Sequence, residues 1–206
     1  MVLGLAIFAQ EIDYSIAANY EYKYLSNTYQ LNDTTLKIVW RENRYDTNLK
    51  QTVNTIVLND SYFSNITDPE RAALGYIATM VGNECQWDGG SPNAEKNNIE
   101  CIILSALNLS YQCSEANKEF FRKWFTEGSE MLRDIDNCNP ILFTATVQTT
   151  IDKITLTTGK EQIKIKYTAL SANIRKQKFE QWSEELTFKL NNDKLEMVKR
   201  EKKVKK

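Results

Sequence analysis

Four cysteines constrain the fold of this chain more than any other feature of its sequence. They lie in the middle of the 206 residues, and the chain contains no histidine. The four are Cys85, Cys101, Cys113 and Cys138. An even set favours two disulfide bonds, for which three pairings exist. Pairing Cys113 with Cys138 would leave Cys85 for Cys101, but the sequence does not choose among the three.

Metal binding and buried free thiols are the other interpretations of these cysteines. Zinc sites usually contain closely spaced cysteine pairs, often with histidine, whereas 15, 11 and 24 residues separate successive cysteines here. A catalytic Ser-His-Asp triad or Cys-His pair needs an imidazole, which this chain lacks. The seven glycines form neither a Walker loop nor a dinucleotide-binding fingerprint. We therefore predict disulfides, and neither a metal site nor another cofactor.

The first ten residues, MVLGLAIFAQ, are apolar and uncharged. They resemble the back half of a secretory signal peptide, with Ala9 near the cleavage point but without the basic segment that normally comes first. The alternative is a buried first strand over Val2–Phe8. Because a bilayer-spanning helix needs about 20 apolar residues, the run is too short to cross a membrane. With the disulfides, it predicts a secreted or periplasmic protein without a membrane span.

Residues 11–198 are expected to form a single domain, because 42% hydrophobic content supports a core that does not depend on the cysteines alone. Residues 199–206, KREKKVKK, carry six basic groups and one acid, which leaves the preceding 198 residues at a net charge of −6. We expect this basic tail to fray. It has one arginine and no aromatic side chain, so we predict no nucleic-acid partner.

The segment from residue 12 to 62 is hard to assign. ANYEYKYL and Thr35–Arg41 alternate apolar with polar residues, which predicts strands, the second with Leu36, Ile38 and Trp40 on one face. Leu49–Leu58 has apolar residues at helical spacing, and we predict a helix there.

Residues 69–138 favour helices. Asp68 and Pro69 predict the start of a helix over 69–83, and a second apolar helical pattern runs over Ile99–Leu109. Ser114 is the expected N-cap of a third helical segment, which Gly128 interrupts. Its aromatic stripe is expected to pack in the core, and a partner-binding groove is the alternative. The stripe consists of Phe120, Phe121, Trp124 and Phe125.

From Ile141 onwards the pattern changes to short alternating runs separated by TGK and NND, which are typical of hairpin turns. Four antiparallel strands in sequence predict a meander. The expected fold is therefore α+β: a helical middle of three to four helices packed on a four-stranded C-terminal meander, with an uncertain β-containing N-terminal segment.

One loop stands out as a candidate site. QWDGGSPNAEKN follows Cys85, and it brings Trp87 and Asp88 close in sequence to Glu84. Two carboxylates beside an aromatic ring are what a glycosidase-like cleft requires. The alternative is an Asp-Gly-Gly turn held by the disulfide, without chemistry.

We expect an exported, disulfide-stabilised, non-catalytic protein of the binding or inhibitor type that recognises a protein or glycan partner, either another protein or a cell-envelope component. The supporting features are the cysteines, the lack of catalytic motifs, and the ten tyrosines and four tryptophans. A carboxylate-based hydrolase and a structural subunit of an envelope assembly are the alternatives.

Overall fold

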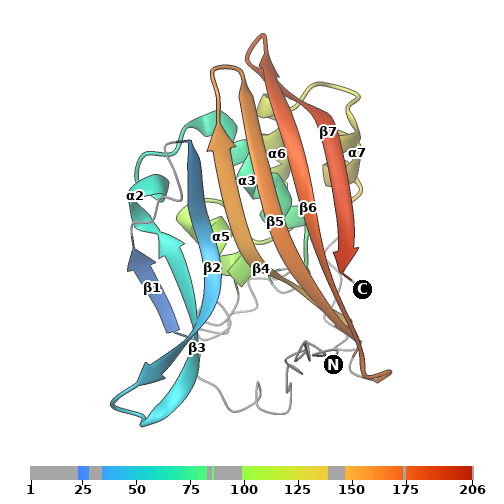
Figure 1. Ribbon diagram of the computed structural model, residues 1–206. Helices are drawn as coiled ribbons and strands as arrows, with labels where there is room; N and C mark the ends of the chain where they lie inside the picture. Colours follow the sequence, from blue (N-terminus) through green and yellow to red (C-terminus); the bar gives the residue numbers. More distant parts are fainter. Residues whose placement is uncertain are drawn as a thin grey trace, which may run out of the picture.

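The computed structural model describes residues 23–27, 34–82, 85, 99–138, 147–173 and 175–205. These residues form one seven-stranded sheet and five helices, and helices α3, α5, α6 and α7 lie behind the sheet in Figure 1. The strand order is β1-β3-β2-β4-β5-β6-β7. Neighbouring strands are antiparallel except β1, which is parallel to β3. The suggested signal remnant at residues 1–10 falls outside the described residues.

Strands from both ends of the chain share this sheet. The N-terminal strands are β1 (Lys23–Asn27), β2 (Thr35–Asp46) and β3 (Gln51–Asn59). The C-terminal strands are β4 (Val147–Thr158), β5 (Gln162–Asn173), β6 (Lys178–Asn191) and β7 (Lys194–Lys205). The predicted architecture of a helical middle on a four-stranded meander is therefore wrong. The protein is still α+β, but β2 pairs with β4, so one continuous sheet joins the two ends.

The helix predicted over Leu49–Leu58 is also wrong, because β3 occupies this segment. Lys50 adopts a left-handed conformation with φ of 52°, which turns the chain back on itself. The following residues then pair with β2 in register from Gln51 opposite Asp46 to Leu58 opposite Val39. The helical spacing arose because Ile56, Val57 and Leu58 are buried in succession.

The C-terminal segment 199–206, expected to fray, instead lies in β7 as far as Lys205. Its register with β6 places Lys205 opposite Gln181 and Lys199 opposite Thr187. The lysines are those of an edge strand, where charge discourages pairing with other chains.

The helices are α2 (Asp60–Phe63), α3 (Asp68–Met80), α5 (Ile99–Ala106), α6 (Glu115–Trp124) and α7 (Glu130–Asp136). Local signals predicted the helices after residue 68 well, whereas α2 was not predicted. Ser114 caps α6 as predicted, because its side chain accepts a hydrogen bond from the backbone N–H of Asn117 at 3.2 Å. The N-cap of α3 is Thr67, one residue before the expected Asp68.

The core lies between the helices and the sheet. Phe121 and Phe125 of the aromatic stripe are almost fully buried, which confirms their assignment to the core. Cys85 is bonded to Cys101, and Cys113 to Cys138, so the predicted disulfides are confirmed.

The alternation predicted for Leu36, Ile38 and Trp40 fails at one point. A bulge between Lys37 and Val39 shifts the register of β2 against β4. Leu36 and Val39 therefore lie on the same side of the sheet as the core residues opposite them. Trp40 lies on the other face with Lys37, whose ammonium group is 4.1 Å from the indole centroid.

Candidate functional site

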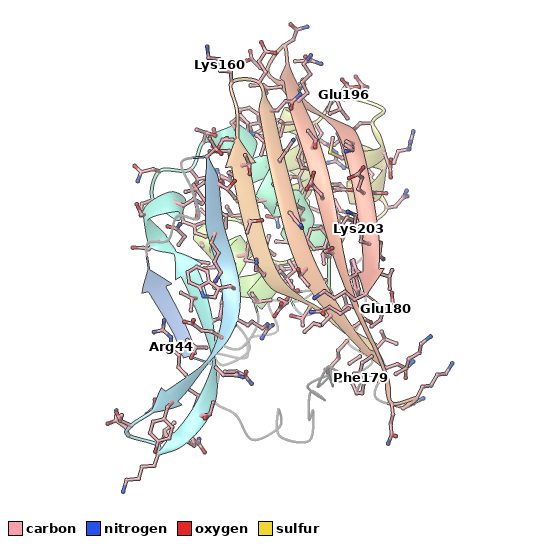
Figure 2. All side chains as sticks on the ribbon, in the orientation of Figure 1. Arg44, Lys160, Phe179, Glu180, Glu196 and Lys203 are labelled. Carbon is pink, nitrogen blue, oxygen red and sulfur yellow. A yellow bond between two sulfur atoms is a disulfide. The ribbon has the colours of Figure 1, made fainter. Side chains whose placement is uncertain are left out.

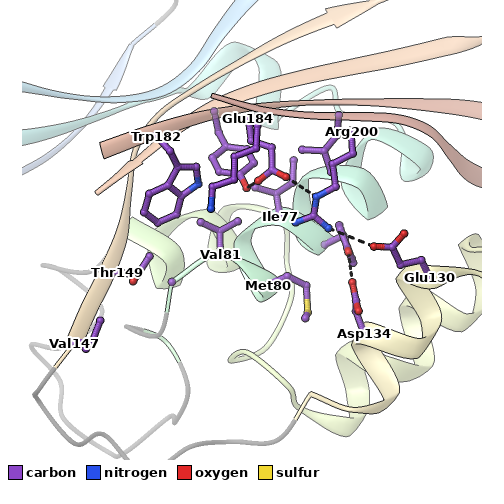
Figure 3. Close-up of a pocket in the computed structure, with 15 residues that line it drawn as sticks. Ile77, Met80, Val81, Glu130, Asp134, Val147, Thr149, Trp182, Glu184 and Arg200 are labelled. Carbon is purple, nitrogen blue, oxygen red and sulfur yellow. Dashed lines mark hydrogen bonds and ion pairs between the residues drawn. The ribbon is translucent and has the colours of Figure 1, made fainter. Parts of the chain in front are cut away.

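A cleft of about 690 Å³ lies between the helix side of the sheet and helices α3 and α7 (Figure 3). The predicted site residues Glu84, Trp87 and Asp88 all lie outside the described residues. The volume is within the usual range for small-molecule sites, about 300 to 1,000 Å³. We therefore treat this cleft as the candidate site.

Strand alternation positions the polar side chains of the cleft. Tyr167 of β5 pairs with Glu184 of β6, and Leu186 of β6 pairs with Arg200 of β7. Residues opposite one another share a face of the sheet. Consequently Tyr167, Glu184 and Arg200 all point toward the helices.

Glu184 is the centre of the polar network. Its side chain is only 3% exposed, and its Oε1 accepts a hydrogen bond from Nε of Arg200. Its Oε2 accepts a hydrogen bond from the hydroxyl of Tyr167. Both carboxylate oxygens are therefore engaged, as a buried charge requires. Burial, followed by the hydrogen bond to Glu184, raises the pKa of Tyr167, so this phenol keeps its proton.

Helix α7 supplies the opposite carboxylates of the network. The hydroxyl of Tyr76 in α3 donates to Oδ2 of Asp134 at 2.7 Å, and Nη1 of Arg200 lies 3.6 Å from Oε1 of Glu130. Burial, followed by the bond to Asp134, raises the pKa of Tyr76. Figure 3 shows Arg200 between Glu184 and Glu130, so one guanidinium links the sheet to α7.

The remaining walls are mostly apolar. Ile77, Met80 and Val81 line the cleft from the end of α3, and Leu186 lines it from β6. Trp182 lies beside them, half-buried, with the ammonium group of Lys202 4.5 Å from its ring centroid. An apolar and aromatic surface thus adjoins a row of hydrogen-bonding groups.

The end of α3 is held in place from behind the cleft. Gln112 is 1% exposed, and its Nε2 donates to the carbonyl oxygens of Ala78 and Thr79 at 2.8 and 3.1 Å. Its Oε1 accepts from the backbone N–H of Cys85 at 3.0 Å. This amide and the disulfide to Cys101 fix the chain where it leaves the helix.

Gly82 lies at the point where α3 meets the sheet. Its φ is +85°, and a Cβ there would lie 2.6 Å from Oε1 of Glu100 and 2.7 Å from the carbonyl oxygen of Thr149. The buried carboxylate of Glu100 in turn accepts the backbone N–H of Ile151 at 2.8 Å. The wall of the cleft therefore depends on a close backbone approach that only glycine allows.

The carboxylates that line the cleft are all engaged in contacts within the protein. Each carboxylate on the cleft already has a partner: Glu184 has Arg200 and Tyr167, Asp134 has Tyr76, and Glu130 has Arg200. Among the described residues, no group of three or more His, Cys, Asp or Glu side chains is arranged to hold a metal ion. What the cleft offers a ligand is fixed donors, fixed acceptors and an aromatic ring.

The sequence interpretation missed Tyr167, Glu184 and Arg200. A signal for Glu184 was present, because QWSEELTF alternates, and Trp182, Glu184, Leu186 and Phe188 fall on one face. A charged residue in such an apolar row indicates a buried, paired group. Arg200 was overlooked because it was assigned to the tail.

A scan against protein-family models, a search of curated proteins and a search of solved structures each found no match. In the described part of the chain, no helix has the length and apolar character needed to cross a membrane. The interpretation of the cleft therefore depends on its own geometry.

Proposed function

We infer that this is an exported binding protein whose cleft holds a small, neutral, polyhydroxylated ligand, of the kind found in cell-envelope saccharides. The observation that carries this proposal is the row of fixed donors and acceptors, from Arg200 to Asp134, beside the half-buried ring of Trp182. A sugar presents hydroxyls that both donate and accept, and an apolar face that stacks on an aromatic ring.

Charge balance favours a neutral ligand. Glu130, Asp134 and Glu184 face Arg200 and Lys202, so the lining has a net charge of −1. A strongly anionic ligand would meet three carboxylates, and a cationic one would compete with two existing cations. Hydroxyl groups, in contrast, can bridge the pairs that are already formed.

The two disulfides support an oxidising compartment, because such bonds form and persist in secreted and periplasmic proteins. They therefore support the prediction that the protein is exported.

The hydrolase alternative receives less support. Glycoside hydrolysis usually needs one protonated carboxyl to act as the acid and a second carboxylate as base or nucleophile. Both oxygens of Glu184 instead accept hydrogen bonds within the protein, from the guanidinium of Arg200 and the hydroxyl of Tyr167. A carboxylate engaged in this way orients Arg200 and Tyr167.

The test is titration of the full chain with a panel of neutral disaccharides and trisaccharides of glucose, galactose, mannose and N-acetylglucosamine, followed by tryptophan fluorescence and calorimetry. We expect saturable binding to at least one member, which Trp182→Ala abolishes. Trp124→Ala, in α6 and outside the cleft, is the matched control and should retain binding. Release of reducing ends over time would favour the hydrolase. Binding that survives Trp182→Ala would contradict the proposed site.

A further inference from the structure

The face of the sheet turned away from the helices is rich in lysine. In β5, Lys164 and Lys166 are exposed and alternate with the buried residues Ile163, Ile165 and Tyr167. Because the cleft lies on the side of Tyr167, the lysines lie on the opposite face. Figure 2 looks onto this face, with the helices behind it and Lys203 labelled on β7.

The strand pairing extends this pattern across five strands. Lys166 lies beside Glu185 and Thr155, and Thr155 lies beside Lys37 of β2. We call the outward positions of β4–β7 and of the part of β2 paired with β4 the lysine face. Its cations are Lys37, Lys153, Lys164, Lys166, Lys189, Lys199, Lys203 and Lys205.

The lysine face concentrates positive charge on an acidic molecule. Its acids are Asp152, Glu185, Glu196 and Glu201. Eight lysines against four acids give a net charge of +4, whereas the whole chain has −1. The other described residues carry 16 basic and 16 acidic side chains, so the excess positive charge of the described part of the chain lies on this face.

Several of these lysines have no ion-pair partner among the described residues. Lys199 is paired with Glu201 at 2.9 Å, but Lys164, Lys166, Lys203 and Lys205 form no such pair there. Lys37 and Lys153 repel one another, since burial and then the charge of Lys153 lower the pKa of Lys37, while the smaller effects of Glu42 and Asp152 act in the opposite direction. The face therefore holds cations whose mutual repulsion a bound polyanion would relieve.

We propose that the lysine face binds a linear anionic polysaccharide, a polymer with carboxylate groups along its length. Neighbouring strands lie about 4.8 Å apart and alternate residues of a strand about 6.6 Å apart, so the ammonium groups form a flat grid that an extended chain can follow. Between the lysines lie hydroxyl side chains, Thr155, Thr157, Thr168 and Ser183, which can hydrogen-bond sugar hydroxyls.

The chemistry of the face favours a polysaccharide over nucleic acid or membrane. All eight cations are lysine, whereas arginine is the side chain that binds phosphate in a bidentate manner. Trp40 is only 5% exposed and lies against Lys37, so it offers no ring for stacking bases. Of the exposed large apolar side chains on these strands, Val147 lines the cleft and Val204 pairs with Trp182 on the cleft side. Phe179, 50% exposed, and Val198 are too few to insert into a lipid surface.

The test measures binding of the full chain to polygalacturonate, with neutral dextran, a single-stranded oligo-dT and phosphatidylglycerol vesicles as comparison probes. The face variant is K164Q/K166Q/K203Q/K205Q. The matched control, K50Q/K123Q/K160Q/K176Q, removes the same charge from exposed positions elsewhere. We expect the face variant to weaken polygalacturonate binding at least about tenfold at low salt and to reduce the salt slope by about 3, while the control changes affinity little.

Circular dichroism and thermal unfolding would establish that both variants fold. An equal loss of polygalacturonate affinity in both variants would show that binding depends only on net charge, and would overturn the assignment to this face. Absence of polygalacturonate binding would also overturn it. Tighter binding to oligo-dT or to the vesicles, lost in the face variant, would overturn the polysaccharide as the partner. Because the cleft opens on the other side of the sheet, the face variant should leave saccharide binding in the cleft unchanged.

Discussion

Glu184 and Arg200, on neighbouring strands β6 and β7, differ sharply in exposure although they share one hydrogen bond: the Glu184 side chain is 3% exposed and that of Arg200 is 45% exposed. The pair is therefore asymmetric. Removing the arginine leaves a buried carboxylate without its cationic partner. Neutralising the acid, in contrast, leaves a cation that water can reach.

We expect Arg200→Gln to lower the free energy of unfolding by about 3 kcal/mol at pH 7, and Glu184→Gln by about 1 kcal/mol, as measured by urea denaturation. Equal costs for the two substitutions at pH 7 would show that the pair is not asymmetric.

Gly82 and Gly128 offer a matched comparison, because both have positive φ, at 85° and 74°. At Gly82 a Cβ would collide with Glu100 and with the backbone of Thr149, whereas at Gly128 it would meet nothing within 4 Å. Gly128→Ala should cost about 1 kcal/mol from backbone strain alone. Gly82→Ala should cost at least about 2 kcal/mol more, and should weaken ligand binding in the cleft. Thermal unfolding would measure the stability of both variants, and fluorescence titration would measure ligand binding. An equal loss of stability in the two variants would contradict this prediction.

The two disulfides close loops of similar size, with sequence separations of 16 and 25. On the chain-entropy model each contributes about 3 kcal/mol, slightly more for Cys113–Cys138. We expect C85S/C101S and C113S/C138S each to lower the free energy of unfolding by about that amount in urea. Reduction of the wild-type protein should approach the sum of the two. A double variant as stable as the oxidised protein would indicate that its disulfide gives no net stabilisation.

Alkaline pH should destabilise the fold through its buried tyrosines. Burial and acidic partners raise the pKa of Tyr76 and Tyr167 above the ordinary value of about 10. A raised pKa in the folded state contributes stability that is complete below the unfolded pKa and is lost as the pH rises past it. The free energy of unfolding, measured in urea between pH 8 and 11, should therefore decline as the pH rises. The decline should be shallower in Tyr167→Phe. The exposed Tyr45→Phe is the control and should follow the wild type.

Local sequence signals were sufficient where the structure depends on neighbours along the chain. Ser114 caps its helix, Asn192 and Asp193 form the tight turn between β6 and β7 with positive φ, and Ile163 and Ile165 face the core as their alternation indicated. Each of these depends on a few consecutive residues, so the pattern is visible without a fold.

The predictions were wrong where the structure depends on pairing between segments that lie far apart in the sequence. Leu49–Leu58 has helical spacing, yet it forms a strand because β2 supplies a long pairing partner. The basic tail is a strand because β6 extends far enough to pair with it. In both cases the hydrogen bonds of the partner strand outweighed the local preference.

By itself, the sequence determined that the protein is α+β, that its cysteines form disulfides, and which residues begin α6 and turn between β6 and β7. Only the tertiary structure decided that both ends of the chain share one sheet, that Glu184, Arg200 and Tyr167 meet in a cleft, and that eight lysines lie on its opposite face. The physical reason is that strand register sets which face and which neighbour each side chain has, and register is fixed by pairing between segments far apart in the sequence.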